Sequence, residues 1–223
     1  MARKRKPLPL LEDVLITDVA AEGNALGRVD DMVVFVPFAA PGDRVDVQVE
    51  KKKKSYAQGR VARLRQRGDV RVDPKCGHFG ICGGCRWQHL PYEYQLKCKR
   101  QQVVDALERI AKVDLPEIPA ALGSGEIWEY RNKMEYTFAA KCWLTREQLE
   151  SGEDFAERRA AGFHIPGAFD KVLDIDRCFL QDDLSNRIRK FVKAYGIDHD
   201  LDFYDARAQE GFLRTMMVRI AST

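Results

Sequence analysis

The chain is organised around the stretch Cys76-Gly77-His78-Phe79-Gly80-Ile81-Cys82-Gly83-Gly84-Cys85, in which glycines lie between three cysteines. Thiolates are ligands for soft metals, and a loop that presents three of them together has already met much of the ordering cost of a metal site. The glycines let backbone N–H groups turn toward the sulfurs, and hydrogen bonds of that kind tune iron–sulfur clusters. The spacing C-x5-C-x2-C therefore predicts a bound metal or an iron–sulfur cluster.

A closed tetrahedral or cubane site needs one ligand more than this loop supplies, so another part of the chain should return to it. The candidates are Cys98, Cys142 and Cys178, and spacing alone does not choose among them. Cys98 fits poorly, because it follows Lys97 in a predicted helix, where a spare thiol on the helix surface is the simpler interpretation. The alternative is a disulfide framework or three buried thiols. Disulfides need an oxidising compartment, and no apolar segment of a secretory signal follows the basic N-terminus, so metal binding is favoured.

Charge is distributed unevenly along the 223 residues, a length that fits one large domain or two small ones. Residues 1–72 carry 15 Lys or Arg against 10 Asp or Glu, residues 73–112 carry 7 against 4, and residues 113–223 carry 15 against 20. The basic first part is therefore expected to face a polyanion. No apolar run is long enough to span a membrane, and we expect a cytoplasmic monomer without membrane association.

Residues 12–65 are predicted to form short β-strands with a turn about every ten residues, which is typical of a small barrel. The expected strands are residues 14–16, 32–36, 45–50 and 57–64, with a glycine-punctuated turn at 21–28 and a second turn at Pro41-Gly42-Asp43. A phosphate-binding loop at residues 23–27 is rejected, because this segment precedes a strand where such loops precede a helix.

A basic run lies between the last two predicted strands. A run of charges is commonly a solvated loop, but Lys and Arg grip phosphates, and a neighbouring aromatic ring can stack on a base. We therefore expect RNA or DNA contact from Lys51, Lys52, Lys53, Lys54, Tyr56, Arg60 and Arg63. The basic arm at residues 1–8 is expected to be a solvated tail, with weak nucleic-acid attachment as the alternative.

The rest of the chain alternates helix and strand signals and predicts a central α+β domain at residues 113–223, after a segment at 73–112 that holds the cysteine loop and a helix. That helix should begin after Pro91, with Leu96, Val103, Leu107 and Ile110 on one face. Strands are expected at residues 128–138, 161–165, 172–175 and 212–220, and a surface loop or short helix at 145–159. A helix over residues 182–196 should point Leu184, Ile188, Phe191 and Val192 inward. The fold class is mainly β, with an OB-like barrel in 1–72 followed by α+β structure.

Three features, in this order, resemble the RNA uracil-C5 methyltransferases, and within them the branch that modifies ribosomal RNA. The barrel is similar to a TRAM domain, an RNA-binding module, in Ala21-Glu22-Gly23, Gly27-Arg28, Val34-Phe35-Val36-Pro37 and Pro41-Gly42-Asp43. The cysteine loop is followed by Gln88-His89 and Tyr94-Gln95-Leu96-Lys97. The third feature is Tyr130-Arg131-Asn132-Lys133, then Gly162-Phe163 and Asp174-Ile175-Asp176-Arg177 before Cys178. The resemblance covers almost the whole chain.

The resemblance implies a [4Fe–4S] cluster held by Cys76, Cys82, Cys85 and Cys178, and it leaves Cys142 as a structural thiol. It also implies an RNA partner, most simply 23S ribosomal RNA, because the tRNA-specific relatives are expected to lack both barrel and cluster. Tyr130, Arg131, Asn132 and Lys133 would contribute to the choice of RNA site. The alternative for these four residues is a strand packed in the sheet, with Arg131 in a salt bridge.

One departure from the family pattern limits the expected activity. The family's S-adenosylmethionine domain supplies a nucleophilic cysteine in an Asp-Pro-Pro-Arg context, and this sequence contains neither that motif nor a glycine-rich loop after a strand. The chain is therefore expected to be the RNA-recognition and iron–sulfur part of a methyltransferase, inactive alone and lacking the S-adenosylmethionine site. A stand-alone RNA-binding module with a structural [4Fe–4S] or zinc site is the alternative. An electron carrier of ferredoxin type is disfavoured by the cysteine spacing and the lysine run.

Overall fold

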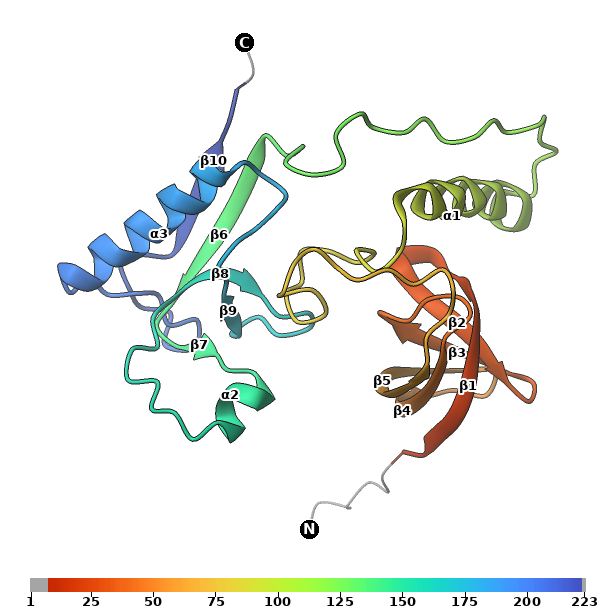
Figure 1. The fold of residues 1–223 in the computed structure, drawn as a ribbon, viewed down its shortest axis with the longest axis horizontal. Coiled ribbons are helices and arrows are strands. Elements are labelled where there is room, and N and C mark those ends of the chain that lie inside the picture. Colours follow the sequence, from red (N-terminus) through yellow and green to blue (C-terminus); the bar gives the residue numbers. More distant parts are fainter. Residues whose placement is uncertain (1–7, 222–223) are drawn as a thin grey trace. The chain divides into compact units, whose positions relative to one another are not determined.

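The computed structural model describes residues 8–221, and Figure 1 shows its elements. The basic arm predicted at residues 1–8 therefore lies, apart from its last residue, outside the described part. Contacts divide the chain into two compact units. The first consists of residues 1–75 and 86–124, and the second of residues 76–85 and 125–223. The cysteine loop thus belongs to the second unit, although the chain enters and leaves it from the first.

Five strands close into a barrel in the first unit, as the sequence predicts. They are β1 (Leu10–Val19), β2 (Asn24–Val29), β3 (Met32–Pro37), β4 (Arg44–Lys52) and β5 (Tyr56–Gln66), in the order β1-β2-β3-β5-β4. A parallel pair, β3 with β5, and an antiparallel pair, β1 with β4, complete the ring. Alternate side chains point inward, and the core is aliphatic. Its members include Val14, Ile16, Ala25, Val34, Val36, Val45 and Val47.

The predicted turn at residues 21–28 is only partly correct. A short 3-10 turn covers Ala21–Gly23, but residues 24–28 belong to β2. Gly27 pairs with Ile16 in that strand, and a Cβ atom at Gly27 would come within 2.5 Å of the Leu15 carbonyl oxygen. Gly27 therefore permits a close approach between β1 and β2. In the sequence, a glycine with this role looks the same as a glycine in a turn.

The Pro41-Gly42-Asp43 turn is confirmed, and its carboxylate is a buried anchor of the barrel. Asp43 accepts hydrogen bonds from the backbone N–H of Ala40 (2.7 Å) and Gly68 (2.9 Å) and from the Arg71 guanidinium (2.7 Å). Burial alone would raise the pKa of Asp43, but these donors outweigh burial and hold the pKa below its ordinary value. A charged pair thus ties the segment after β5 to the turn before β4.

A helix, α1 (Tyr92–Asp105), continues as a π-helical turn η2 (Ala106–Ala111) and ends at Lys112. The predicted apolar face is not the one that packs, because Val103 is 49% exposed and Ile110 81% exposed. Cys98 is buried against Val19, Ala40 and Leu90, which corrects the expectation of a surface thiol. No helix in the described residues is long and apolar enough to cross a membrane.

The second unit contains a mixed sheet of five strands in the order β10-β6-β8-β9-β7. Its elements are β6 (Lys133–Ala139), β7 (Cys142–Trp143), α2 (Arg146–Glu150), β8 (Ala160–His164), β9 (Val172–Asp174), α3 (Asp183–Asp198) and β10 (Thr215–Arg219). Only the β7–β9 pair is parallel. The predicted strand over residues 128–138 begins later than expected, and the predicted strand over 212–220 is shorter. Figure 1 shows α3 beside β6 and β10.

The inward face of α3 differs from the prediction. Leu184 is 52% exposed and Phe191 69% exposed, whereas Ser185, Asn186 and Arg189 are buried. Ile188 is also exposed, and Val192 is half-buried. Each buried polar side chain has a partner: Ser185 Oγ lies 2.8 Å from Tyr136 Oη, and Asn186 bonds both the N–H and the carbonyl of Cys178. Hydrogen bonds of buried polar side chains, and not the spacing of its apolar residues, therefore determine which face of α3 packs against the sheet.

Candidate cysteine centre and nucleic-acid interface

The cysteine loop is a series of tight turns docked on the sheet of the second unit. The N–H of Phe79 donates to the Cys76 carbonyl (3.1 Å), and the N–H of Cys82 donates to the His78 carbonyl (2.9 Å). Gly83 donates to the carbonyl of His164 at the end of β8 (3.2 Å). A Cβ atom at Gly83 would lie 2.8 Å from that oxygen, so this position requires glycine.

Cys178 follows β9 and faces the same loop. The N–H of Asp176 donates to Nε2 of His78 (2.9 Å), and Sγ of Cys76 lies 4.0 Å from the carbonyl oxygen of Arg177. The backbone of Cys178 is held on its other side by Asn186 of α3. The structure therefore brings a distant cysteine to the loop, and it is the cysteine that the resemblance selected.

The four thiols interact with one another. Burial raises the pKa of Cys82 to about 11, the N–H of Gly84 opposes this shift from 3.4 Å, and the thiols of Cys85, Cys178 and Cys76 each raise the pKa further. The pKa of Cys178 is raised for the same reasons, with burial the main cause. Burial thus favours the protonated thiols of Cys82 and Cys178, so a metal would have to displace their protons.

The other two cysteines lie elsewhere. Cys98 belongs to the first unit. Cys142 is in β7, where its backbone exchanges hydrogen bonds with Arg158 (2.6 and 2.9 Å). No disulfide joins the six cysteines, all of which lie in the described part of the chain. Within residues 8–221, no group of three or more His, Cys, Asp or Glu side chains has an arrangement that could hold a metal ion. Cys178 nevertheless lies beside the loop, and Cys82 accepts from the N–H of Gly84, so the residue types are those that soft metals and iron–sulfur clusters use.

A buried arginine beside this centre escaped the sequence analysis. Arg189 of α3 is 1% exposed, and its guanidinium donates to the carbonyl oxygens of Ala161 (2.9 Å) and Asp176 (2.7 Å). Its Nε has no hydrogen-bond partner among the described residues. Burial lowers the pKa of Arg189, and the thiol of Cys178 lies close enough to interact with its charge. No sequence signal pointed to it, because the apolar residues of α3 indicated the opposite face.

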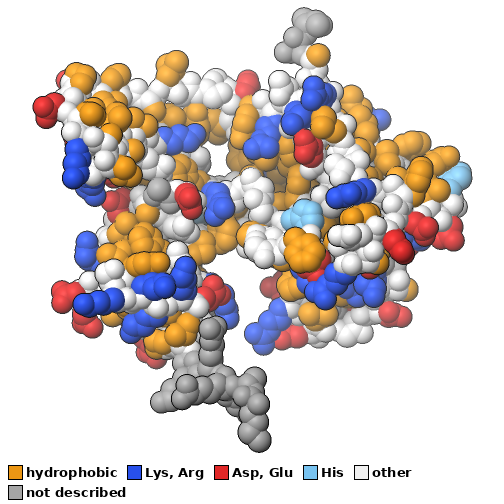
Figure 2. Space-filling model, turned by 180° about the vertical axis from the view of Figure 1, so that it is seen from behind, with side chains coloured by type: hydrophobic (Ala, Val, Ile, Leu, Met, Phe, Trp, Pro, Cys, Tyr) orange, Lys and Arg blue, Asp and Glu red, His pale blue; other side chains and the backbone are white. Residues whose placement is uncertain are grey.

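The basic residues predicted to bind nucleic acid lie on a hairpin of the barrel. Lys51 and Lys52 end β4, Lys53 and Lys54 form the connection, and all four are exposed. Tyr56 begins β5 and packs edge-on against Phe35 with 6.1 Å between ring centres. Arg60 and Arg63 are exposed on β5, and Arg60 lies 3.4 Å from Glu50. We call these seven residues the basic hairpin. Figure 2 shows further Lys and Arg side chains on the visible face of both units.

Tyr130, Arg131, Asn132 and Lys133 precede or begin β6, and all four side chains are exposed. Their backbone is anchored, because Arg131 N–H donates to the Leu180 carbonyl and the Asn132 carbonyl accepts from Ile220 N–H, both at 2.9 Å. The ion pair here is formed by Lys133 with Glu135 (2.9 Å). Arg131 forms no salt bridge among the described residues, and its guanidinium lies 4.0 Å from the Met134 sulfur. Lys133 already belongs to the paired strand β6. A role of these four residues in RNA binding therefore stays a prediction.

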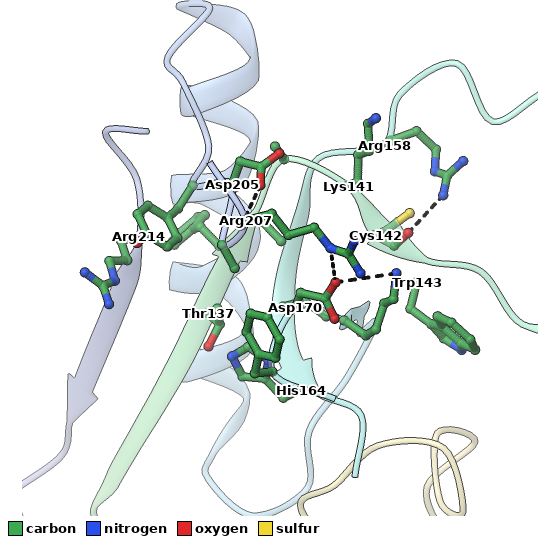
Figure 3. A pocket seen from close by; sticks show the side chains of 18 of the residues that line it. Thr137, Lys141, Cys142, Trp143, Arg158, His164, Asp170, Asp205, Arg207 and Arg214 are labelled. Atoms are coloured by element: carbon green, nitrogen blue, oxygen red, sulfur yellow. Dashed lines mark hydrogen bonds and ion pairs between the residues drawn. The ribbon is translucent and has the colours of Figure 1, made fainter. Parts of the chain in front are cut away.

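A hollow of about 640 Å³ lies at the opposite end of β6. Figure 3 shows Lys141 and Trp143 beside β7, Arg158 from the segment before β8, and Arg207 reaching toward Asp170. Residue spacing gave no hint of this site, because its members come from several separate segments of the chain between residues 137 and 215. We call it the sheet-edge pocket.

Comparisons with known proteins agree with this organisation. The TRAM domain family matches residues 12–62, which form most of the barrel. The chain is 49% identical over 92% of its length to an uncharacterized RNA methyltransferase of Bacteroides thetaiotaomicron, of which it covers 45%. It is 52% identical over 93% of its length to a second one, from Porphyromonas gingivalis, of which it covers 46%. The chain thus spans less than half the length of these curated relatives.

A solved structure is similar along the same extent. The tRNA (uracil-54, C5)-methyltransferase of Pyrococcus abyssi, in complex with S-adenosyl-L-homocysteine, is 26% identical with a TM-score of 0.60. The match covers 93% of this chain and 42% of that one. A match of this extent includes the barrel. The expectation that tRNA-specific relatives lack the barrel is therefore not supported, and tRNA returns as a candidate substrate. Along nearly its whole length, the chain is similar to part of proteins named RNA methyltransferases and to part of a tRNA uracil-C5 methyltransferase.

Proposed function

We propose that this chain is the RNA-recognition part of an S-adenosylmethionine-dependent RNA uracil-C5 methyltransferase. The observation that carries the proposal is the similarity of both units, over 93% of the chain, to an enzyme of that activity solved with S-adenosyl-L-homocysteine. That compound is what remains of S-adenosylmethionine after methyl transfer. The relatives named RNA methyltransferases support the same reaction class.

The reaction sets what a recognition part must do. In the family chemistry, a cysteine adds to C6 of uracil, C5 takes the methyl group, and the C5 proton is then removed. The target base must first leave its stack, so the enzyme needs to hold the RNA on either side of it. We assign no catalytic residue to this chain, because none of its cysteines lies in the family's nucleophile motif.

Two sets of residues are suited to hold that RNA. The basic hairpin presents four exposed lysines beside the ring of Tyr56, and such groups contact phosphates with little regard for sequence. Tyr130, Arg131, Asn132 and Lys133 offer exposed amide, guanidinium and phenol groups on an anchored backbone, so they can contribute to the choice of site. The first set supplies affinity and the second supplies selectivity.

We further propose that Cys76, Cys82, Cys85 and Cys178 hold a [4Fe–4S] cluster, with zinc as the alternative metal. The position of the Cys178 segment beside the cysteine loop, in the same unit, and the backbone N–H groups at Cys82 and Cys178 support this assignment. The cluster would fix the loop to the segment after β9 and would keep the neighbouring RNA-facing residues in place.

For the RNA itself, the family resemblance favours 23S ribosomal RNA. Transfer RNA is the second candidate, because the Pyrococcus abyssi enzyme acts on uracil 54 of tRNA and matches the barrel as well as the sheet. Binding of the chain to transcripts of 23S RNA fragments and of tRNA, measured against salt concentration, tests both.

Replacement of Lys51–Lys54 by alanine should weaken binding to all RNAs, and each lost phosphate contact should flatten the slope of log affinity against log salt by about 0.7–0.9. Arg146→Ala is the control, because this arginine is exposed on α2 and pairs only with Glu150 among the described residues. If the unaltered chain binds neither RNA more tightly than it binds a random transcript, the recognition role is wrong. Equal affinity of the lysine variant and the unaltered chain would exclude the basic hairpin.

A further inference from the structure

We propose that the sheet-edge pocket is a second RNA-binding site, which takes one nucleotide of a single-stranded segment between aromatic rings and basic side chains. This inference rests on the proposed function, because it assumes that RNA is the partner. It adds a site built from residues other than the basic hairpin and the four residues around Arg131.

The pocket has the dimensions of a ligand site. Its volume of about 640 Å³ falls in the range of roughly 300–1,000 Å³ that small-molecule sites occupy. Its walls are the ends of β6 and β10, the short strand β7, the loop before β9 and the loop over residues 204–209. These loops lie on a five-stranded sheet, which gives the site a rigid floor.

Its charge is opposite to that of the surrounding sequence. Five basic residues line the pocket, against two acidic ones, Asp170 and Asp205. Residues 113–223 as a whole carry 15 Lys or Arg against 20 Asp or Glu. A positive hollow in an acidic segment favours binding of an anion at that place. The basic residues are Lys141, Arg158, Lys171, Arg207 and Arg214.

The two carboxylates are already engaged. Asp170 pairs with Arg207 (2.5 Å) and Lys171 (3.8 Å), as the dashed lines in Figure 3 mark. Asp205 accepts from the backbone N–H groups of Arg207 (2.8 Å) and Ala208 (3.1 Å), which fold the loop around it. Lys141, Arg158 and Arg214 form no salt bridge among the described residues, although the charge of Lys141 also acts on Asp205.

Aromatic rings stand among these cations. Trp143 is 39% exposed and Phe169 is 71% exposed, although both are large apolar side chains. The ammonium of Lys171 lies 6.0 Å from the Trp143 ring centre, and the guanidinium of Arg214 lies 4.5 Å from that of Tyr204. Exposed rings beside Lys and Arg form the platform on which proteins stack unpaired bases while binding the neighbouring phosphates.

A buried donor adds polarity to the wall. The terminal nitrogen of Arg158 donates to the Cys142 carbonyl (2.9 Å), but its Nε is buried without a hydrogen-bond partner among the described residues. An unpartnered donor of this kind is costly unless a ligand or water completes it. An oxygen-rich ligand such as a nucleotide supplies that acceptor, whereas an apolar ligand does not.

The site lies on a path that RNA could follow. Lys133 and Thr137 belong to the same strand, β6, and the strand rise places them about 13 Å apart. The four exposed residues around Arg131 lie at one end of this strand and the sheet-edge pocket at the other. One extended segment could therefore contact both sets, so each must be tested separately.

The experiment uses the whole chain and a short oligouridylate that carries one 4-thiouridine. Irradiation should crosslink the probe to peptides that contain Trp143 or Phe169, in addition to the basic hairpin. Uridine monophosphate should quench the fluorescence of Trp143, and inorganic phosphate should do so only weakly. Trp143→Leu should weaken binding of the oligouridylate by about tenfold, the effect expected for loss of one base stack.

A second variant tests the charges without altering the rings. Lys141→Ala with Arg214→Ala should also weaken binding by about tenfold and lower the salt slope by about 1.4, because two phosphate contacts to a single strand are lost. Arg187→Ala, on the exposed face of α3, is the matched control and should bind as the unaltered chain does. Thermal unfolding of each variant checks that the sheet remains folded.

The outcomes separate this proposal from the broader one. If crosslinks stay on the basic hairpin and both pocket variants bind normally, the sheet-edge pocket is not an RNA site, while RNA binding by the barrel stands. Equal effects of inorganic phosphate and uridine monophosphate would overturn the base-stacking part. If the unaltered chain binds no RNA at all, the proposed function fails and takes this inference with it.

Discussion

The interiors of the barrel and of the second unit differ in composition, although both bury one face of a β-sheet. The barrel fills its interior with aliphatic side chains such as Val34, Val36 and Val47, and its buried carboxylates, Asp43 at a turn and Asp46 on β4, are each paired with an arginine. In the second unit, four thiols, an asparagine, a glutamine and an arginine share the interior with the apolar groups. Apolar contacts are interchangeable, whereas a buried polar group requires a specific partner.

This difference decides how each unit responds to change. A core of valines loses roughly the transfer free energy of the atoms that are removed. A polar interior loses more when one partner is missing, because the other is left buried and unsatisfied. The second unit should therefore depend on a few residues, and the barrel should spread its stability over many.

Loss of the metal centre should have the largest effect and should be confined to the second unit. All four proposed ligands belong to that unit, and binding free energy at such a site is also folding free energy. Chain purified without oxygen should be brown, with about four irons if the cluster is a cubane. Chelation or oxidation should expose the second unit to limited proteolysis and leave the barrel intact.

The ligand assignment is tested by three single variants. Cys178→Ser should lose the metal, while Cys98→Ser and Cys142→Ser should retain it, because Cys98 belongs to the other unit and Cys142 is in β7. Metal analysis and the visible absorption spectrum provide the readout. A colourless protein with one bound zinc would replace the cluster by a zinc site, and loss of metal from the Cys98 variant would show that the fourth ligand is misassigned.

Removal of the buried arginine should be the next largest effect. Arg189→Ala leaves the carbonyl oxygens of Ala161 and Asp176 without their donor, and it should lower the free energy of unfolding of the second unit by about 3–5 kcal/mol. Arg187→Ala, on the same helix but exposed, should change it by less than about 0.5 kcal/mol. Urea unfolding followed by circular dichroism measures both. Similar losses of stability in the two variants would mean that α3 does not bury Arg189 in preference to Arg187.

Asp43 is a buried polar anchor of the barrel, and its removal should cost somewhat less. Asp43→Asn weakens the bonds to Arg71, Ala40 and Gly68 and should destabilise the barrel by about 3 kcal/mol. Because the pKa of Asp43 is lower in the folded chain than in the unfolded one, its charge stabilises the barrel fully above about pH 4. That stabilisation is lost as the pH falls through the folded-state value.

The pH dependence separates this mechanism from simple loss of packing. The unaltered barrel should lose stability on acidification below about pH 4, and the Asp43→Asn variant should show a flatter dependence in the same range. Parallel pH profiles for the two proteins would mean that the pKa of this carboxyl is the same in the folded and the unfolded chain.

Sequence reasoning succeeded where burial alone shapes the chain. The strict alternation of Val45, Val47 and Val49 predicted β4, and the other barrel strands followed from the same period. It failed at Gly27, where a close contact between strands looks like a turn. On α3 it pointed to the wrong face, because hydrogen bonds to Tyr136 and to the Cys178 backbone outweigh the apolar stripe.

The candidate sites divide in the same way. The cysteine loop is local in sequence and was recognisable from its spacing, while the partner Cys178 came only from the family resemblance. The sheet-edge pocket is formed by Lys141, Arg158, Lys171 and Arg207, which no periodic pattern connects. Only strand pairing brings them together, since β7 aligns with β9 in parallel.

The smallest expected change in stability is that of Phe191→Ala on α3, and it tests most directly the comparison between the interiors of the two units. Phe191 is the most exposed large apolar side chain of α3, so Phe191→Ala removes little buried surface and should change the free energy of unfolding by less than about 0.5 kcal/mol. Val47→Ala in the barrel deletes fewer atoms, yet it should cost about 2–3 kcal/mol, because Val47 is fully buried in an aliphatic core. Urea unfolding of the two variants side by side provides the measurement. If the phenylalanine variant loses as much stability as the valine variant, the apolar stripe of α3 is packed after all, and the sequence pattern was the better guide to this helix.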